Sequence, residues 1–465
     1  MPTIWRLTAA AILVGCGGGG PSDVPAPTEV RVTSVVPASG TIAGATNVTI
    51  TGSNFDDVVS VTIGGGELMN RVVVSSTQIT GMTPGGGTPG ARDVVVTTSS
   101  RSGTCAGCFT YTANPLAAAS ISAGYYHACA LTADGTALCW GQGTSGELGN
   151  GGATIRLAAT PVATDQKFVS ISAGATFTCA RTSAGAVYCW GDNSQGQLGN
   201  GTFSRAQVPV LVPGQTFASV SAGRYHACGL AASGVAYCWG YNGEGELGDG
   251  SMTNRASPVA VSGNLTFASI SAGNSHTCGL TTAGNAYCWG SNYYGQLGDG
   301  SQTNSIVPIA VAQGTTFDEL IAGGGHTCGR TGAGKIYCWG WGEYGQLGQG
   351  SNSSSSSPVI VSGNLSFIDL EVGVRHACAR VSGDKTYCWG DNGSLQLGQT
   401  GLGTSAVPVA VSTQLAFPAI STGFFHSCAI ASDGFAYCWG DGAVGQLGNA
   451  ATNITSAAPV HVLGP

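Results

Sequence analysis

The stretch HACALTADGTALCWGQGTSGELGNG, residues 127–151, places a histidine, two cysteines and a glutamate close together in the sequence. Cysteine and histidine are common zinc ligands, so metal binding is the first chemistry to weigh. A zinc site needs four ligands in closely spaced pairs, whereas nine residues separate Cys129 from Cys139. A disulfide between these cysteines is therefore the preferred interpretation, with a metal site and free buried thiols as the alternatives.

The same stretch recurs along the chain, which bears directly on its chemistry. The first cysteine falls at residues 129, 179, 228, 278, 328, 378 and 428, and the second follows ten residues later each time. A histidine lies two residues before the first cysteine in six of the seven copies, and Phe177 replaces it in the second copy. A catalytic residue is needed once, whereas one that returns in each repeat is scaffold. We interpret these histidines as structural and hydrogen-bonded, with a ring of metal ligands around a channel as the alternative.

A turn between the two cysteines predicts how they meet. Ala133-Asp134-Gly135 suits a three-residue hairpin loop with glycine in the left-handed conformation. Such a loop sets Cys129 opposite Cys139, where two strands bring cysteines within disulfide distance. Cys105 and Cys108 form a C-x-x-C motif before a predicted strand; a redox-active dithiol would need a helix N-terminus, so a local disulfide is predicted instead. The predicted disulfide cysteines are Cys105, Cys108, Cys129, Cys139, Cys179, Cys189, Cys228, Cys238, Cys278, Cys288, Cys328, Cys338, Cys378, Cys388, Cys428 and Cys438.

The elements that position these cysteines are short strands. A period of 49 or 50 residues indicates a solenoid or a propeller, and each unit contains four strand-like segments, such as PVAV, FASISAG, HTCGLT and NAYCWG. The first unit lacks a preceding Pro-Val segment, while the chain ends on an extra one, PVHV, at residues 459–462. We predict an all-β protein in which residues 115–465 form a seven-bladed β-propeller closed by the C-terminal strand, which would complete the first blade.

Two family resemblances follow from these motifs. The Trp-Gly, Gly-Gln-Leu-Gly and Ala-Gly-x-x-His patterns resemble the repeat of the regulator of chromosome condensation family. Nuclear members of that family promote nucleotide exchange on a small GTPase through an inserted β-wedge; the even spacing here leaves no room for a wedge, so exchange activity is not expected. Residues 28–114 contain about seven alternating strands, and VTSVVPASGTIAGATNVTITGSNF resembles the IPT/TIG immunoglobulin-like domain. That resemblance implies a β-sandwich that acts as a spacer or adhesive module.

The N-terminal segment predicts where in the cell the protein is located. The segment MPTIWRLTAAAILVGC has Arg6, an apolar run and then Leu13-Val14-Gly15-Cys16, which resembles the lipobox of bacterial lipoprotein signal peptides. The resemblance implies a signal peptide over residues 1–15 and acylation of Cys16; a plain secretory signal or a short core segment is the alternative. Residues 16–27 read as a flexible tether. We expect a lipid-anchored protein of the bacterial cell envelope, at the outer membrane or cell surface, that touches the membrane through its lipid alone.

Composition limits the partners. Charged residues make up 8% of the chain, lysine occurs three times and the net charge is −7, so no phosphate-tracking surface and no nucleic-acid partner are expected. No Gly-x-Ser-x-Gly, His-Glu-x-x-His or P-loop motif occurs, so no cofactor is predicted. Asp249 and Asp299 suggest calcium, but asparagine, glutamine or threonine replaces them in other repeats, so no metal site is predicted.

Residues that differ between repeats are free to recognise a ligand. They are the pair after Ala-Gly and the four residues after Trp-Gly, which an antiparallel hairpin places at one end of each blade. Exposed tyrosine, tryptophan and arginine favour binding hot spots, although loop aromatics could also pack against neighbouring blades. We predict a monomeric, non-catalytic scaffold for a protein ligand, including an inhibited enzyme, or a glycan; an unknown hydrolase or lyase on this face is the alternative. The predicted binding residues are Tyr125, Tyr126, Arg224, Tyr225, Tyr241, Tyr293, Tyr294, Trp341, Tyr344, Arg375, Phe424 and Phe425.

Overall fold

The computed structural model describes residues 29–42, 44–85, 89–312 and 314–465. All secondary-structure elements assigned in these ranges are β-strands, which confirms the all-β prediction. The chain divides into two compact units, which meet in the sequence between Tyr111 and Thr112 apart from short loop segments. The predicted signal peptide, Cys16 and most of the predicted tether lie outside the described residues.

The first unit contains two antiparallel sheets with alternating burial. One has the order β1 (Arg31–Val36), β3 (Asn47–Ser53), β7 (Gln78–Met82) and β6 (Met69–Ser75). The other has the order β2 (Ser39–Thr41), β9 (Ser102–Thr112), β8 (Gly90–Thr98), β4 (Val58–Ile63) and β5 (Gly66–Glu67). Ile50 and Ile79 of the first sheet and Val94 and Val96 of the second are fully buried. This is the pattern of a sandwich with one polar and one apolar face on each sheet.

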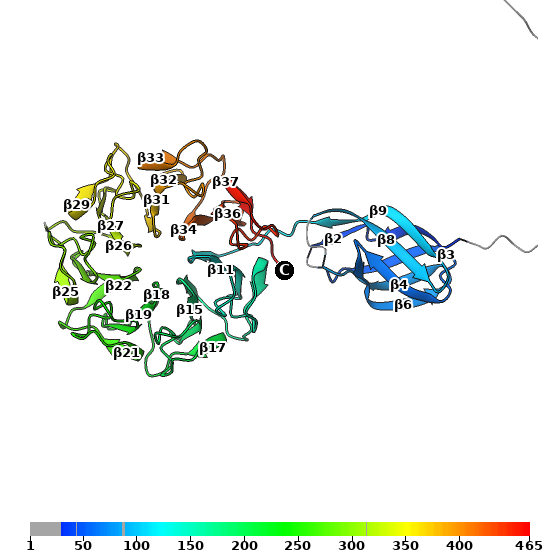
Figure 1. The fold of residues 1–465 in the computed structure, drawn as a ribbon, viewed down its shortest axis with the longest axis horizontal. Coiled ribbons are helices and arrows are strands. Elements are labelled where there is room, and N and C mark those ends of the chain that lie inside the picture. The colour runs from blue at the N-terminus through cyan, green and yellow to red at the C-terminus, as the bar shows by residue number, and fades with distance from the viewer. Residues whose placement is uncertain (1–28, 43, 86–88, 313) are drawn as a thin grey trace, which may run out of the picture. The chain divides into compact units, whose positions relative to one another are not determined.

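The second unit contains seven four-stranded antiparallel sheets within the described residues, and Figure 1 shows them arranged in a ring. We number these blades in chain order. Blades 1 to 4 are β10 (Ser120–Ala123), β11 (His127–Leu131), β12 (Ala137–Gly141) and β13 (Arg156–Pro161); β14 (Ser170–Ala173), β15 (Phe177–Arg181), β16 (Val187–Gly191) and β17 (Ala206–Leu211); β18 (Ser219–Ala222), β19 (His226–Leu230), β20 (Ala236–Gly240) and β21 (Arg255–Ala260); and β22 (Phe267–Ala272), β23 (His276–Thr281), β24 (Ala286–Gly290) and β25 (Ser305–Ala310). Blades 5 to 7 are β26 (Glu319–Ala322), β27 (His326–Arg330), β28 (Ile336–Gly340) and β29 (Ser355–Ile360); β30 (Glu371–Val372), β31 (His376–Val381), β32 (Lys385–Asp391) and β33 (Thr404–Ala410); and β34 (Ala419–Thr422), β35 (His426–Ile430), β36 (Ala436–Asp441) and β37 (Thr455–His461).

The prediction that the C-terminal strand completes the first blade is wrong. β37 pairs with β36 inside the last blade, and the first blade has its own outer strand, β13. The reason is that the loop after Trp-Gly turns the chain back along the strand it has just left, so that Cys139 faces Thr160 across the outer pair. Each blade therefore takes its four strands from consecutive residues, and the Pro-Val segment belongs to the blade before it.

The ring closes through short backbone contacts between the two ends of this unit. The Leu116 amide donates to the Val462 carbonyl at 2.8 Å, and the Ala436 amide donates to the Leu116 carbonyl at 2.9 Å. The Ala159 amide of blade 1 donates to the Leu463 carbonyl at 2.9 Å. The residues that flank the repeats therefore join blade 7 to blade 1 without an exchanged strand.

Glycine is required where the inner strands meet at the axis. A Cβ added to Gly273 would collide with the Gly323 carbonyl oxygen, and the same holds between each inner glycine and that of the next blade. Gly423 faces the Gly124 carbonyl in the same way, so the sequence of contacts closes on itself. We name these residues the glycine ring: Gly124, Gly174, Gly223, Gly273, Gly323, Gly373 and Gly423. The Ala-Gly motif thus sets how closely the blades approach one another.

The cysteines of each blade pair across its central hairpin as the turn geometry predicts. Cys129 lies directly opposite Cys139, with their Cα atoms 4.1 Å apart, and the other six blades have Cα separations of 4.0 or 4.1 Å. Gly135 has the left-handed φ of 82° that the turn requires. Cys105 also pairs with Cys108, but both lie within β9 rather than before a strand. Among the described residues, no helix has the length and hydropathy needed to cross a bilayer.

Candidate binding face

The repeated histidines lie at the seams between blades. His127 Nε2 lies 2.9 Å from Thr178 Oγ1 of the next blade, and Thr178 Oγ1 donates to the Glu147 carbonyl at 2.9 Å. Because the threonine proton is used in that bond, His127 must donate from Nε2. Burial lowers the pKa of His127 to about 3 and keeps the ring neutral. The same contact joins His226 to Thr277, His276 to Thr327 and His376 to Ser427.

Two seams lack this hydrogen bond. His326 and His426 face blades that carry Ala377 and Ala128 in place of the hydroxyl residue, and neither ring has a partner among the described residues. Blade 2 avoids the problem with Phe177, whose neighbour in the next blade is Ala227. The histidine or phenylalanine and the residue across the seam therefore pack together between neighbouring blades.

Tryptophan and leucine complete the seams. Trp190 Nε1 donates to the Glu147 carbonyl at 2.9 Å, the same oxygen that Thr178 uses, and each of the seven Cys-Trp-Gly tryptophans makes the equivalent bond to the preceding blade. Leu148 of the Gly-Glu-Leu-Gly motif is fully buried, as are its equivalents. The motif in the opening stretch is therefore architectural.

Asp249 and Asp299, which suggested a calcium site, make hydrogen bonds within their own loops. Asp249 accepts hydrogen bonds from Asn242 Nδ2 and Ser251 and pairs with Arg255 at 2.9 Å. Asp299 accepts from Asn292 Nδ2 and Ser301. In the part of the chain that the structure describes, no group of three or more histidine, cysteine, aspartate or glutamate residues could hold a metal ion.

The two variable sets meet at one end of each blade, as the hairpin geometry predicts. The amide of the residue after Trp-Gly donates to the carbonyl of the second residue after Ala-Gly, as in Trp341 to Gly325 at 2.8 Å and Asp391 to Arg375 at 2.9 Å. The first residue of the pair directly follows a glycine of the glycine ring, and Tyr125, Asn274 and Val374 in this position line a cavity between the inner strands. We name the surface formed by both variable sets the mouth face.

Nine of the twelve predicted binding residues form one continuous cluster on this face. Tyr294 stacks on Trp341 with ring centres 5.3 Å apart, and Phe424 stacks on Phe425 at 3.9 Å. Arg375 joins the two stacks, with its guanidinium carbon between 4.8 and 5.7 Å from the ring centres of Tyr344, Phe424, Phe425 and Trp341. We name this cluster the aromatic arc; it runs across blades 4 to 7 and blade 1. Its residues are Tyr293, Tyr294, Trp341, Tyr344, Arg375, Phe424, Phe425, Tyr125 and Tyr126.

The arc is partly preformed and partly open. Its rings are half-buried against one another, whereas Tyr293 is 73% exposed. Gly325 leaves space for the stack of Tyr294 on Trp341, because a Cβ at residue 325 would lie 3.2 Å from the Tyr294 ring and 3.4 Å from Trp341 Cβ. Asp391 lies 4.0 Å from the Arg375 guanidinium, which holds that side chain among the rings. Burial raises the pKa of Tyr126, and the nearby Asp441 carboxylate adds to the shift, so that this phenol stays uncharged.

The remaining three predicted residues form a separate small cluster. Arg224 lies over the Tyr225 ring at 4.7 Å, and Tyr225 contacts the Tyr241 ring at 6.4 Å. Within the described residues, no ring contact joins this group to the aromatic arc. The structure therefore divides the predicted face into one large cluster and one small one.

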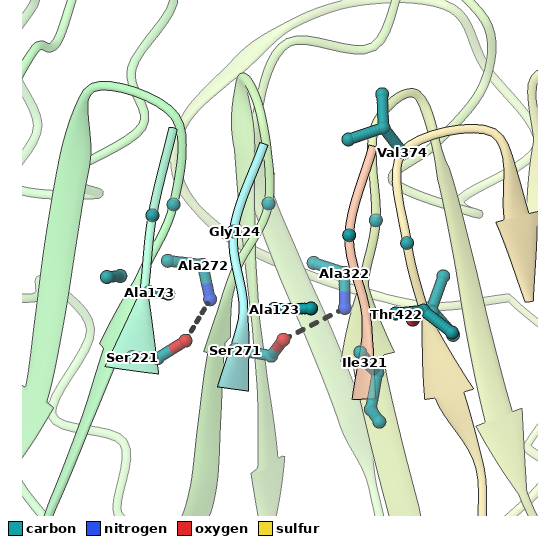
Figure 2. Close-up of a pocket in the computed structure, with 18 of the residues that line it drawn as sticks. Ala123, Gly124, Ala173, Ser221, Ser271, Ala272, Ile321, Ala322, Val374 and Thr422 are labelled. Atoms are coloured by element: carbon teal, nitrogen blue, oxygen red, sulfur yellow. Dashed lines mark hydrogen bonds between the residues drawn. The ribbon is translucent and has the colours of Figure 1, made fainter. Parts of the chain in front are cut away.

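A central cavity of about 170 Å³ opens between the inner strands of all seven blades (Figure 2). In most blades its wall is Ser-Ala-Gly, and the serine accepts a hydrogen bond from the alanine amide of the next blade, as Ser221 does from Ala272 and Ser271 from Ala322. Blades 5 to 7 differ, with Ile321 and Glu371 in place of serine and Thr422 in place of alanine. Sequence reasoning missed these residues, although their departure from the repeat was visible in an alignment of the seven copies.

Comparisons with known proteins agree with this architecture. A family profile described as an RCC1-like domain matches residues 105–417, one described as an IPT/TIG domain matches residues 31–113, and one described as a regulator of chromosome condensation (RCC1) repeat matches residues 419–446. A search of curated proteins found no match.

Solved propellers show the same fold at low identity. Human WBSCR16 is 20% identical with a TM-score of 0.63, over 70% of this chain and 88% of that one. Yeast RCC1 (Prp20), solved with Kap60 bound, is 21% identical with a TM-score of 0.63, over 70% of this chain and 83% of that one. A second structure, of Prp20p from Saccharomyces cerevisiae, is 19% identical with a TM-score of 0.63, over 73% of this chain and 88% of that one. The RCC1-like profile covers more than half of the chain, and the chain therefore belongs to the RCC1-like domain family.

Proposed function

We propose that this protein is a non-catalytic binding scaffold that holds a protein ligand on the aromatic arc. The observation that carries the proposal is the arc itself: nine residues from five blades contact one another on a surface where the repeat otherwise imposes no residue type. Aromatic and arginine side chains supply most of the affinity at protein interfaces when they are held in place before binding.

Several features favour a protein over a glycan as the ligand. The arc extends over several blades and includes Arg375, whose guanidinium is packed among four rings and can pair with a carboxylate on a partner. The yeast relative has been solved with the protein Kap60 bound, and its binding to Gsp1p and histones has been studied. These relatives are similar in fold alone, so they support a protein ligand without naming it.

Catalysis is not supported by the same surface. A hydrolase or lyase needs a nucleophile and a base in hydrogen-bond contact. In the cavity beside the arc, serine hydroxyls accept hydrogen bonds from backbone amides, and Glu371 is the only carboxylate that lines it among the described residues.

We further propose that the scaffold is a monomer tethered in the bacterial cell envelope. The lipobox-like sequence ending at Cys16 and the polar segment after it support lipid attachment followed by a flexible tether. Replacing Cys16 with serine and measuring partition into detergent phase tests the anchor: the wild type should enter the detergent phase and the variant should not.

The arc is tested by comparing three forms of the full chain, each carrying Cys16→Ser for solubility. A Tyr293→Ala/Tyr294→Ala/Trp341→Ala variant removes one end of the arc, and Thr144→Ala/Ser194→Ala alters exposed polar residues at the position of Tyr293 in blades 1 and 2, outside the arc. Proteins captured from envelope extracts are identified, purified and titrated against each form. We expect affinity to fall by about thirtyfold or more in the arc variant and to stay unchanged in the polar variant. Equal affinity for all three forms would remove the arc as the binding surface.

A further inference from the structure

Blades 5 to 7 depart from the repeat in the central cavity, and new polar side chains meet at the seam between blades 6 and 7. In blades 1 to 4 the inner strand presents serine followed by alanine, whereas blade 6 presents Glu371 in the serine position and blade 7 presents Thr422 in the alanine position. Glu371 and Thr422 both line the cavity, and Figure 2 shows Thr422 and Ile321 in the lower part of the view, with Val374 nearer the top. The other blades act as internal controls, because they show that the fold itself needs neither a carboxylate nor this hydroxyl.

Neither polar group is satisfied by the protein. Thr422 is 7% exposed, and its Oγ1 has no hydrogen-bond partner among the described residues. Glu371 is half-buried and likewise receives no hydrogen bond or ion pair from a described side chain. A buried hydroxyl without a partner costs free energy, and a ligand that donates a hydrogen bond to it would recover that cost.

The surroundings of this seam are apolar on one side and acidic on the other. Ile321, Val372 and Val374 line the same wall of the cavity. Glu319 and Asp369 lie close enough to influence Glu371, but their charges are paired with Arg330 at 3.0 Å and with Arg380 respectively. Burial raises the pKa of Glu371 to about 8, and the two carboxylates add to the shift. A cation that entered the cavity would therefore meet one unpaired acid beside aliphatic side chains.

We propose that this seam binds a primary alkylammonium group, with the ammonium between Glu371 and Thr422 and the methylenes against Ile321, Val372 and Val374. The Glu371 carboxylate and the Thr422 hydroxyl accept two of the three ammonium N–H donors. The cavity volume of about 170 Å³ suits one unbranched chain of a few carbons rather than a planar guanidinium with its five donors. The group comes either from a free amine or from a lysine side chain of a macromolecule that reaches the cavity past Tyr125 and Val374 at the mouth face.

This site does not depend on the proposed protein ligand, since it uses different residues. The test uses the full chain with Cys16→Ser and follows binding of n-butylammonium by ligand-observed NMR at pH 9, with n-butanol as the neutral control. At this pH an alkylamine with a pKa near that of lysine, about 10.4, is still mostly charged. We expect saturable binding of the ammonium ion and none of the alcohol.

Two variants restore the residues of the other blades and so should fold normally, which circular dichroism and thermal melting check. Glu371→Ser should weaken n-butylammonium binding at least about tenfold, and Thr422→Ala should weaken it less. Binding to the unaltered chain should also weaken about tenfold between pH 9 and pH 7, because the carboxyl must lose its proton first. The Tyr293→Ala/Tyr294→Ala/Trp341→Ala variant should bind the amine as well as the unaltered chain does.

A second probe, the peptide acetyl-Gly-Lys-Gly-amide, distinguishes the two sources. Binding of both probes supports a lysine side chain as the natural group, and binding of n-butylammonium alone supports a small free amine. No binding of either probe, or equal binding by the unaltered chain and Glu371→Ser, would overturn the proposal. Loss of protein capture with amine binding intact would affect the aromatic arc alone.

Discussion

The packed interior of the propeller and its mouth face differ in how much their residue types vary from blade to blade. At the seams the same residue types return from blade to blade: a glycine at the axis, a tryptophan whose indole N–H bonds the preceding blade, and a disulfide across each central hairpin. At the mouth face the equivalent positions range from Gly324 and Asn274 to Phe424. The backbone geometry is shared, so the difference lies in what each position has to contact. Repetition marks the residues that build the ring, and variation marks those free to recognise a ligand.

The largest expected effect comes from removing the seven hairpin disulfides. Each closes a loop of about eleven residues, which the chain-entropy model values at about 3 kcal/mol. All fourteen cysteines are buried in the native state, so we expect a reductant to act only after unfolding. Urea unfolding of the full chain with and without dithiothreitol should show a lower midpoint under reduction. If thiol titration shows that the disulfides are reduced and the urea midpoint is unchanged, the disulfides do not stabilise the folded state.

Acid provides the second test of the seams. Burial lowers the pKa of His127, His226, His276, His326 and His376 to about 3 and that of His426 to about 4. The unfolded chain binds these protons below the ordinary histidine pKa of about 6.5, so their stabilising effect is complete above that pH and is lost as pH falls toward 3.

Buried glutamates oppose this loss over part of the range. Burial raises the pKa of Glu147 and Glu246 to about 7 and that of Glu371 to about 8, while Glu319 shifts in the same direction. These groups hold protons in the folded state that the unfolded chain releases above about pH 4.5, so they stabilise the fold more as pH falls to that value. Unfolding should therefore take up about two to three protons between pH 6.5 and 4.5 and about four near pH 4, and stability changes by about 1.4 kcal/mol per proton per pH unit. Urea midpoints measured across pH 7.5 to 4 check the change of slope; a flat profile would contradict buried neutral histidines.

A pair of glycine substitutions compares the two regions directly. Gly273→Ala places a Cβ against the Gly323 carbonyl in the glycine ring, and we expect a loss of about 1–3 kcal/mol in the free energy of unfolding. Gly325→Ala on the mouth face meets the Tyr294 ring at 3.2 Å, and a side chain can turn aside where a backbone cannot. Its cost should stay below about 1 kcal/mol. Equal losses in thermal or urea unfolding would erase the distinction.

The smallest expected effect is an increase in the free energy of unfolding. Ala377→Thr gives His326 the hydroxyl partner that His127 has in Thr178. The new hydroxyl can also donate to the Gln346 carbonyl, which already accepts from Trp389. A satisfied buried hydrogen bond adds about 0.5–1.5 kcal/mol. Thr178→Ala should have the opposite sign, and a stabilising Thr178→Ala would show that the seam hydroxyls are dispensable.

Sequence reasoning succeeded where local geometry decides the outcome. The turn at Ala133-Asp134-Gly135 fixes the register of its hairpin, and the opposition of Cys129 and Cys139 follows without knowledge of the rest of the fold. The assignment of strands to blades failed, because it depends on whether the long loop after Trp-Gly returns to the same sheet or passes to the next. Nothing in the Pro-Val segment itself distinguishes these paths.

The site was predicted in part for a similar reason. Backbone topology brings the two variable sets to one face, so the residue list could be drawn from the repeat alone. The union of nine of these residues into one cluster depends on Arg375 reaching four rings and on the space left by Gly325, which are side-chain properties. Glu371 and Thr422 are not among the predicted residues, because the prediction used only the positions after Ala-Gly and Trp-Gly, and these two residues come before the glycine of the inner strand.

The short span of each hairpin bridge has a consequence for biosynthesis. Partners are ten positions apart in the chain in all seven blades. As the polypeptide is made from its N-terminal end, both members of a pair emerge well before the first cysteine of the following blade. Correct oxidation can thus proceed one hairpin at a time, so that mispairing is limited by order of synthesis rather than by later reshuffling.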